Sequence, residues 1–145
     1  MACSNFWAMN ILFLCVGNSA RSQIAEGLAK EMLSNKYNIE SAGSNPSESI
    51  VSEAVETMNE IGIDISNQYP KSIQDLDNNF IKKIDYVITF CNEEICPALQ
   101  SSPKKIHWPI PNPVIDGMNK KQNKQIFKST REVIFNLLKN FFSRE

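Results

Sequence analysis

The feature that most constrains this 145-residue chain is the pair Cys15 and Arg21. They lie six positions apart, where a buried strand leads into a helix. The apolar run Ile11–Leu14 predicts the strand, and α/β proteins bind their ligands at the carboxyl ends of such strands. A loop, Val16–Arg21, follows, and a helix is expected to begin near Ser22. Backbone N–H groups of such a loop and of the helix N-terminus attract anions. The junction therefore predicts a site for a tetrahedral oxyanion.

Two side chains give this loop its chemistry. The planar guanidinium of Arg21 can bind two oxygens of phosphate, arsenate or sulfate. Thiols near helix N-termini and cations have pKa values lowered to roughly 3.5 to 7.5, so we expect Cys15 to be a thiolate at neutral pH. A buried structural thiol is the alternative, because cysteine is often simply packed. The strand and helix on either side favour a nucleophile.

The remaining loop residues are predicted to shape the site. Gly17 lets the backbone approach a ligand closely, and Asn18 is expected to adopt an unusual backbone angle and to tie the loop together. Ser22 is either the helix N-cap or a hydrogen-bond partner of the Cys15 sulfur, and the sequence leaves both open. The predicted oxyanion-binding residues are Val16, Gly17, Asn18, Ser19, Ala20, Arg21 and Ser22.

A cysteine, five residues, an arginine and a serine resemble the signature loop of low-molecular-weight tyrosine phosphatases and of the arsenate reductases that share their fold. Further segments resemble the arsenate reductase branch in order and spacing, from Met9 onward. They are SAG at 41–43, GIDISNQ at 62–68, DYVITFC at 85–91, CP at 96–97 and HWPIPNP at 107–113.

Strands that alternate with helices predict an α/β fold, a single domain with a parallel sheet wound on both faces. The resemblance implies a four-stranded sheet in the order 2-1-3-4. Residues 1–8, with Cys3, are expected to be an N-terminal extension of a domain spanning 9–145. The expected strands are 11–14, 37–43, 85–90 and 104–108, and the expected helices are 22–34, 47–61, a short one within 66–84, and 120–142.

Composition excludes several classes of function. Fifteen basic and sixteen acidic residues give no excess of positive charge that would attract nucleic acid or an anionic membrane. We expect a cytoplasmic protein, since the sequence has neither a membrane-spanning apolar stretch nor a secretory signal. The cysteines lack zinc-ligand spacing and His107 is the only histidine, so no metal is predicted and His107 is expected to be packed and hydrogen-bonded.

Cys91 and Cys96 decide between reduction and hydrolysis. Converting arsenate to arsenite takes two electrons, which a pair of thiols supplies on forming a disulfide. The resemblance implies that Cys15 attacks arsenate, that Cys91 then attacks Cys15, and that a Cys91–Cys96 disulfide results. An external dithiol, thioredoxin or else glutaredoxin, would reduce that disulfide, and no bound cofactor is expected. Two unrelated packed thiols are the alternative.

Two positions depart from the family pattern. Ala20 stands where many thioredoxin-coupled relatives have a cysteine, which leaves the choice of reductant more open. Asn112 stands where the family has an aspartate that acts as general acid, and general acid catalysis is typically worth about 10²–10⁴-fold. Asp116 could substitute, but a turn residue before Gly117 is the favoured interpretation.

Three functions are therefore compared. The leading hypothesis is an arsenate reductase. A phosphatase acting on phosphotyrosine or a small phosphoester would need only Cys15 and Arg21, and Asn112 argues against it. A non-catalytic oxyanion or phosphopeptide binder would keep the loop without using Cys91 and Cys96.

Overall fold

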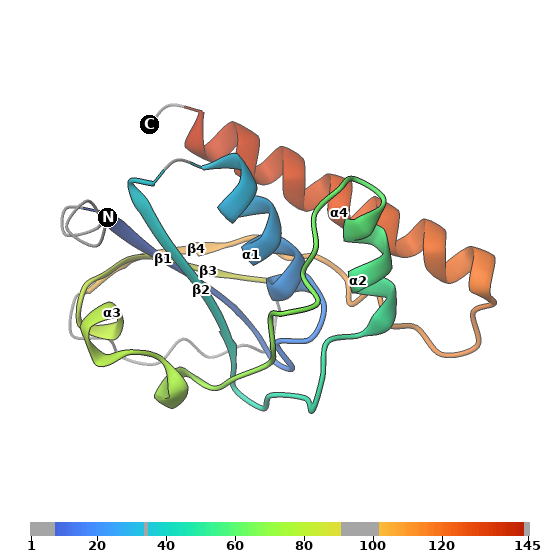
Figure 1. Cartoon of the computed structure of the whole chain (residues 1–145), viewed down its shortest axis with the longest axis horizontal. Coiled ribbons are helices and arrows are strands. Elements are labelled where there is room, and N and C mark those ends of the chain that lie inside the picture. Colours follow the sequence, from blue (N-terminus) through green and yellow to red (C-terminus); the bar gives the residue numbers. More distant parts are fainter. Residues whose placement is uncertain (1–7, 34, 91–101, 144–145) are drawn as a thin grey trace.

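The computed structural model describes residues 8–33, 35–90 and 102–143 and forms a parallel sheet flanked by helices (Figure 1). The strand order is β2-β1-β3-β4 and each neighbouring pair is parallel, which confirms the predicted fold. Cys3, Cys91 and Cys96 lie outside the described residues. The strands are β1 Met9–Cys15, β2 Tyr37–Gly43, β3 Ile84–Thr89 and β4 Lys104–His107.

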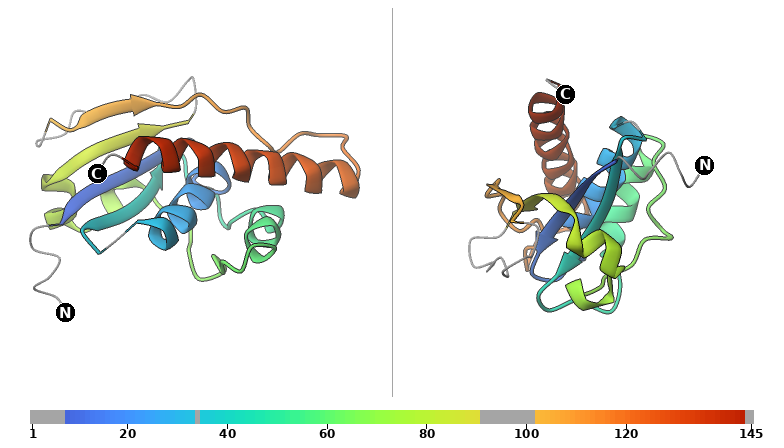
Figure 2. Two further views of the ribbon diagram at one scale, coloured as in Figure 1. Left: turned by 90° about the horizontal axis from the view of Figure 1, so that it is seen from above. Right: turned by 90° about the vertical axis from the view of Figure 1, so that its left-hand side faces the viewer.

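Helices cover both faces of this sheet. The first and last helices pack together on one face, with the second against both, while the short third helix lies on the opposite face (Figures 1 and 2). The buried Arg131 joins the last helix to the second, because its Nη1 donates to the Thr57 carbonyl at 2.7 Å. The helices are α1 Arg21–Met32, α2 Ser52–Asn59, α3 Asn78–Lys82 and α4 Lys120–Phe142, with a 3₁₀ turn η2 at Ile73–Asp75.

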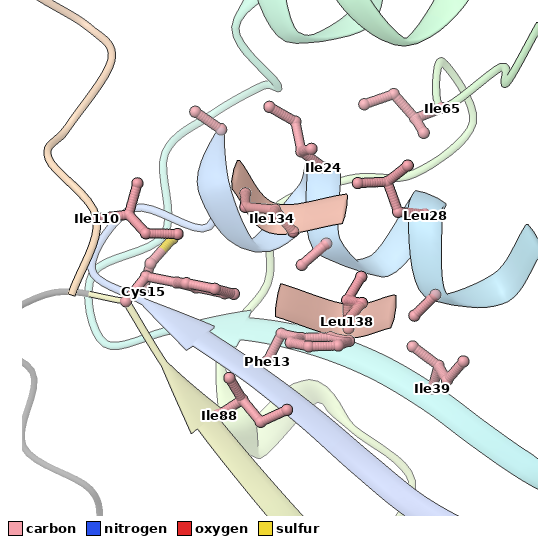
Figure 3. Close-up of a cluster of buried hydrophobic side chains, with 14 of the residues drawn as sticks. Phe13, Cys15, Ile24, Leu28, Ile39, Ile65, Ile88, Ile110, Ile134 and Leu138 are labelled. Carbon is pink, nitrogen blue, oxygen red and sulfur yellow. The ribbon is translucent and has the colours of Figure 1, made fainter. Parts of the chain in front are cut away.

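The central strand β1 is buried on both faces, as the doubly wound arrangement requires. Ile11, Phe13 and Cys15 point into the larger apolar cluster, which includes side chains of α1 and α4 (Figure 3). Leu12 and Leu14 point into the smaller cluster on the α3 side. Cys15 therefore ends a rigid strand.

The carboxyl ends of the strands meet at one edge of the sheet. Cys15 is paired with Gly43, and Leu14 with Thr89. A Cβ atom on Gly43 would lie 2.5 Å from the Val16 carbonyl oxygen, so a larger residue there would displace the start of the loop. The glycine of the SAG segment is thus needed for the loop to turn directly at the end of β1.

One predicted helix is shorter than expected. Apolar spacing predicts a helix over 47–61, but α2 begins at Ser52. The backbone N–H groups of Ser47 and Val51 instead donate to the carbonyls of Gly17 and Ser19, at 2.9 and 3.0 Å. Hydrogen bonds to the loop that follows β1 thus replace the first turn of the helix.

Candidate active site

The carbonyl oxygens of the loop between β1 and α1 accept hydrogen bonds from groups outside the loop. Those of Val16, Gly17 and Ser19 accept from the backbone N–H groups of residues 45, 47 and 51, at 2.9 to 3.0 Å. The Asn18 carbonyl accepts from Gln23 Nε2 at 2.9 Å. Because C=O and N–H point in opposite directions across a trans peptide, the N–H groups of residues 17–20 are turned away from these partners. Amides with this orientation are available to bind an anion.

Asn18 ties the inside of the loop together, as predicted. Its φ of 51° places it in the left-handed region. Its side chain is completely buried and its Nδ2 donates to Ser22 Oγ at 2.7 Å and to Ser41 Oγ at 3.0 Å. The Oδ1 atom accepts from the Lys71 backbone N–H at 3.0 Å. A short polar side chain is needed here both for the backbone angle and for these bonds.

Ser22 contacts the sulfur of Cys15. The two side-chain atoms are 2.9 Å apart, and both residues are buried. Helix α1 begins at Arg21, and its N-cap, Ala20, makes no side-chain capping bond. Of the two roles that the sequence left open, the structure places Ser22 on the sulfur and not at the cap.

Arg21 lies between the loop and the proline-rich segment 109–113. Its Nη1 donates to the Ile110 carbonyl at 2.7 Å. Ile110 is buried close to Cys15 (Figure 3). Asn112 is exposed, and its Oδ1 accepts from the Val114 backbone N–H at 3.0 Å. The Asn112 amide is therefore used to shape its own turn.

A cluster of charges lies behind the loop. Ser41 Oγ donates to Glu26 Oε1 at 2.5 Å, and the Lys71 ammonium lies 3.8 Å from Glu26 and 3.9 Å from Glu40. Burial, and then the negative charge of Glu26, raise the pKa of Glu40, whereas Lys71 lowers it. Hydrogen bonds therefore connect Cys15 through Ser22, Asn18 and Ser41 to this cluster.

The profile of the low molecular weight phosphotyrosine protein phosphatase family matches residues 10–144. The chain belongs to this family. An arsenate reductase of Staphylococcus aureus strain bovine RF122 is 40% identical over 136 residues, which is 92% of this chain and 96% of that protein.

Two solved structures of arsenate reductases are similar to this member of the phosphatase family. An arsenate reductase in the phosphate binding state has a TM-score of 0.77 and 26% identity, and the match covers 94% of this chain and 98% of that one. The Corynebacterium glutamicum thioredoxin-dependent arsenate reductase has a TM-score of 0.69 and 29% identity, over 95% of this chain and 64% of that one.

The histidine prediction needs a correction. His107 Nδ1 lies 2.7 Å from Thr89 Oγ1, but the residue is exposed and not packed, because it ends β4 at the edge of the sheet. Its neighbour Trp108 packs against Phe90 and Phe141 instead. Asp116 is exposed in the turn that Gly117 completes with a φ of 83°, which agrees with the predicted turn role.

The structure unites only part of the predicted site. It brings together Cys15, residues 16–20, Arg21 and Ser22, whereas Cys91 and Cys96 follow β3 outside the described residues.

Among residues 8–33, 35–90 and 102–143, no cluster of three or more histidine, cysteine or acidic side chains could hold a metal ion. The helices in these ranges include none long and apolar enough to span a membrane.

Sequence reasoning missed the support behind the loop. Glu26, Ser41 and Lys71 come from α1, β2 and the segment before η2, and only the folded chain brings them together. Ser41 had a signal, since it lies in the SAG segment. Lys71 had none, because a lysine in a polar stretch is usually a surface residue.

Proposed function

We propose that this chain is an arsenate reductase that converts arsenate to arsenite with Cys15 as its nucleophile. The observation that carries the proposal is the 2.9 Å contact between Ser22 Oγ and the Cys15 sulfur at the base of the amide nest. A hydroxyl that donates to sulfur and a nearby helix N-terminus both favour the thiolate. The 40% identity to a staphylococcal arsenate reductase supports the choice of substrate.

The first step is a substitution at arsenic. The loop N–H groups and the Arg21 guanidinium bind the oxygens of arsenate, and the Cys15 thiolate forms a bond to arsenic while hydroxide or water leaves. Phosphate has the same shape and charge, so it should compete for the nest. The related arsenate reductase in the phosphate binding state is consistent with this competition.

The second step transfers electrons. The Cys91 thiolate attacks the Cys15 sulfur, a disulfide forms between them, and the electron pair of the sulfur–arsenic bond leaves with arsenic as arsenite. Cys96 then attacks Cys91, which releases Cys15 as a thiolate and leaves a Cys91–Cys96 disulfide. Arsenic gains two electrons and two thiols lose them, so the step balances.

An external dithiol must close the cycle. Thioredoxin is the favoured reductant because a structural relative is a thioredoxin-dependent arsenate reductase, and glutaredoxin is the alternative. Ala20 in place of a loop cysteine does not enter the scheme, since Cys15, Cys91 and Cys96 suffice.

Ester hydrolysis is the weaker hypothesis. A phosphatase must protonate its leaving oxygen, and Asn112 has no acidic proton to give. A purely binding function would leave the contact between Ser22 and the Cys15 sulfur without a use. Both alternatives predict that loss of Cys91 changes nothing.

A coupled assay separates the three. With thioredoxin, thioredoxin reductase and NADPH, arsenate should drive NADPH consumption by the wild-type protein, and Cys15→Ser and Cys91→Ser should each abolish it. The control is Cys3→Ser, which should turn over arsenate normally. Release of nitrophenol from its phosphate ester by both wild type and Cys91→Ser, without arsenate turnover, would instead indicate a phosphatase. Phosphate binding without either activity would indicate a binder.

A further inference from the structure

Lys71 is a buried lysine behind the oxyanion loop. Its side chain is 8% exposed, and its ammonium lies 3.8 Å from Glu26 Oε1 and 3.9 Å from Glu40 Oε1. It also lies over the ring of Tyr69, 5.0 Å from the centroid. It also donates to the Tyr69 carbonyl at 3.4 Å. An unpaired ammonium would be costly in such a place, and the two carboxylates supply the opposite charge that it needs.

The backbone of Lys71 contacts the loop and its neighbour directly. The Lys71 N–H donates to Asn18 Oδ1 at 3.0 Å, and the Lys71 carbonyl accepts from the Gly43 N–H at 2.8 Å. The first of these bonds orients the Asn18 amide. With its oxygen on Lys71, its nitrogen faces Ser22 and Ser41.

This orientation leaves the Ser22 proton available for the nucleophile. An amide nitrogen only donates, so Ser22 Oγ accepts from Asn18. A Cys15 thiolate, 2.9 Å away, can only accept, so Ser22 is the donor when the sulfur is ionised. A hydrogen bond donated to sulfur stabilises the thiolate over the thiol.

The side chain of Lys71 reaches Asn18 by a second route. Its ammonium pairs with Glu26, Glu26 accepts from Ser41, and Ser41 accepts from Asn18. Lys71 therefore holds Asn18 both directly, through its N–H, and indirectly, through its ion pair.

We propose that Lys71 is a positioning residue for the nucleophile: its ammonium, held by Glu26 and Glu40, keeps its backbone on Asn18 and so keeps Ser22 donating to the Cys15 sulfur. The inference rests on the proposed role of Cys15. It assigns a task to a residue that lies fifty-six positions from the nucleophile and touches no substrate.

The chain offers a matched control in Lys30. Its ammonium lies 2.6 Å from the other oxygen of Glu26, but its side chain is 50% exposed. Because the Lys30 ammonium is half exposed, water screens its attraction to Glu26 more than that of the buried Lys71. Lys30 and Lys71 thus share a carboxylate, and only Lys71 contacts Asn18.

The test is the pH dependence of alkylation of Cys15 in the reduced, full-length protein. Limited iodoacetamide labelling between about pH 5 and pH 9 brackets a lowered thiol pKa, and mass spectrometry of the chymotryptic peptide distinguishes Cys15 from the other cysteines. In Lys71→Met the midpoint should rise by about one pH unit, which slows labelling near pH 6 about tenfold. Lys30→Met should stay within about twofold of wild type. In Lys71→Arg, which keeps the positive charge, the midpoint should lie between those of wild type and Lys71→Met.

A purely structural role has a different outcome. If Lys71→Met melts at a lower temperature but labels with the wild-type midpoint, the proposal is wrong. If that variant does not fold, Lys71→Gln carries the same prediction, with circular dichroism to show that it is folded. The alkylation assay uses neither arsenate nor an electron donor such as thioredoxin. If the midpoint rises in Lys71→Met but the wild-type protein does not reduce arsenate, the proposed function is wrong and the role of Lys71 stands.

Discussion

The two sides of the candidate active site are built differently. On the nucleophile side, Asn18, Ser22 and Ser41 are completely buried, and the loop carbonyls have partners outside the loop. On the opposite side, the segment 109–118 is anchored by the buried Ile110 but exposes Asn112, Val114, Ile115 and Met118.

This difference shows that the fold preorganises the loop and the nucleophile, and not the segment 109–118. A loop whose amides and sulfur are fixed before a ligand arrives spends no energy on rearrangement during the reaction. The exposed segment has an amide, Asn112, whose side chain shapes its own turn. The arrangement suits a reaction driven by thiols more than one driven by proton transfer.

Removing the central side chain of the rigid region should have the largest effect. Asn18→Ala leaves Lys71 N–H without its acceptor and forces an alanine to a φ of 51°, so we expect a loss of about 3 kcal/mol in the free energy of unfolding. Arsenate turnover should fall by about a hundredfold or more, since loss of one preorganised element costs about 10²–10³ in related sites. Thermal unfolding and the coupled assay measure both.

Asn18→Gly separates backbone strain from hydrogen bonding. Glycine adopts a positive φ without cost, so this variant should regain about 1 kcal/mol relative to alanine. Its turnover should stay low, because the bonds to Ser22 and Ser41 are still missing. Recovered turnover would mean that the side chain of Asn18 does not organise the site.

Restoring an acid on the open side should have a smaller effect. Asn112→Asp returns a proton donor to the segment beside Arg21, and we expect nitrophenyl phosphate hydrolysis to rise about tenfold, below the typical 10²–10⁴-fold because the side chain is exposed. The gain should disappear at a pH above the aspartate pKa. Asn112→Ala is the control and should leave hydrolysis unchanged. If aspartate gives no gain, the absence of an acid does not limit hydrolysis.

The smallest effect is expected at Glu40, on the edge of the charge cluster. Burial and Glu26 raise its pKa above the ordinary 4.5, so its ionised form opposes folding. That cost is absent below about pH 4.5, where the carboxyl is protonated in both states, and it is complete once the pH exceeds the raised pKa. Glu40→Gln should therefore melt slightly above wild type at neutral pH, and the difference should vanish in acid. A lower melting temperature at neutral pH would mean that the attraction of Lys71 for Glu40 outweighs burial.

The sequence predicted those parts of the molecule that local patterns determine. Helix α4 and strand β2 have the predicted bounds, because a long amphipathic repeat and a short strand that ends in glycine are local signals. The Cys15–Arg21 loop and the role of Asn18 followed from residue types at fixed spacing.

Contacts between distant segments could not be predicted in this way. The N-terminal turns of the expected helix at 47–61 are replaced by bonds to a loop thirty positions earlier. The competition for Ser22 between the helix cap and the sulfur was settled by the geometry of the loop. The pairing of Lys71 with Glu26 depends on the docking of three elements, and no short pattern contains it.

The most direct test of the account is the disulfide state of the protein after a single turnover without reductant. Reduced wild-type protein treated with arsenate should lose two hydrogens, about two mass units, and peptide mapping should find a Cys91–Cys96 disulfide. In Cys96→Ser the disulfide should instead join Cys15 and Cys91. Thiols that stay reduced after arsenate treatment, or a Cys91–Cys96 disulfide that forms equally well in Cys15→Ser, would contradict the account.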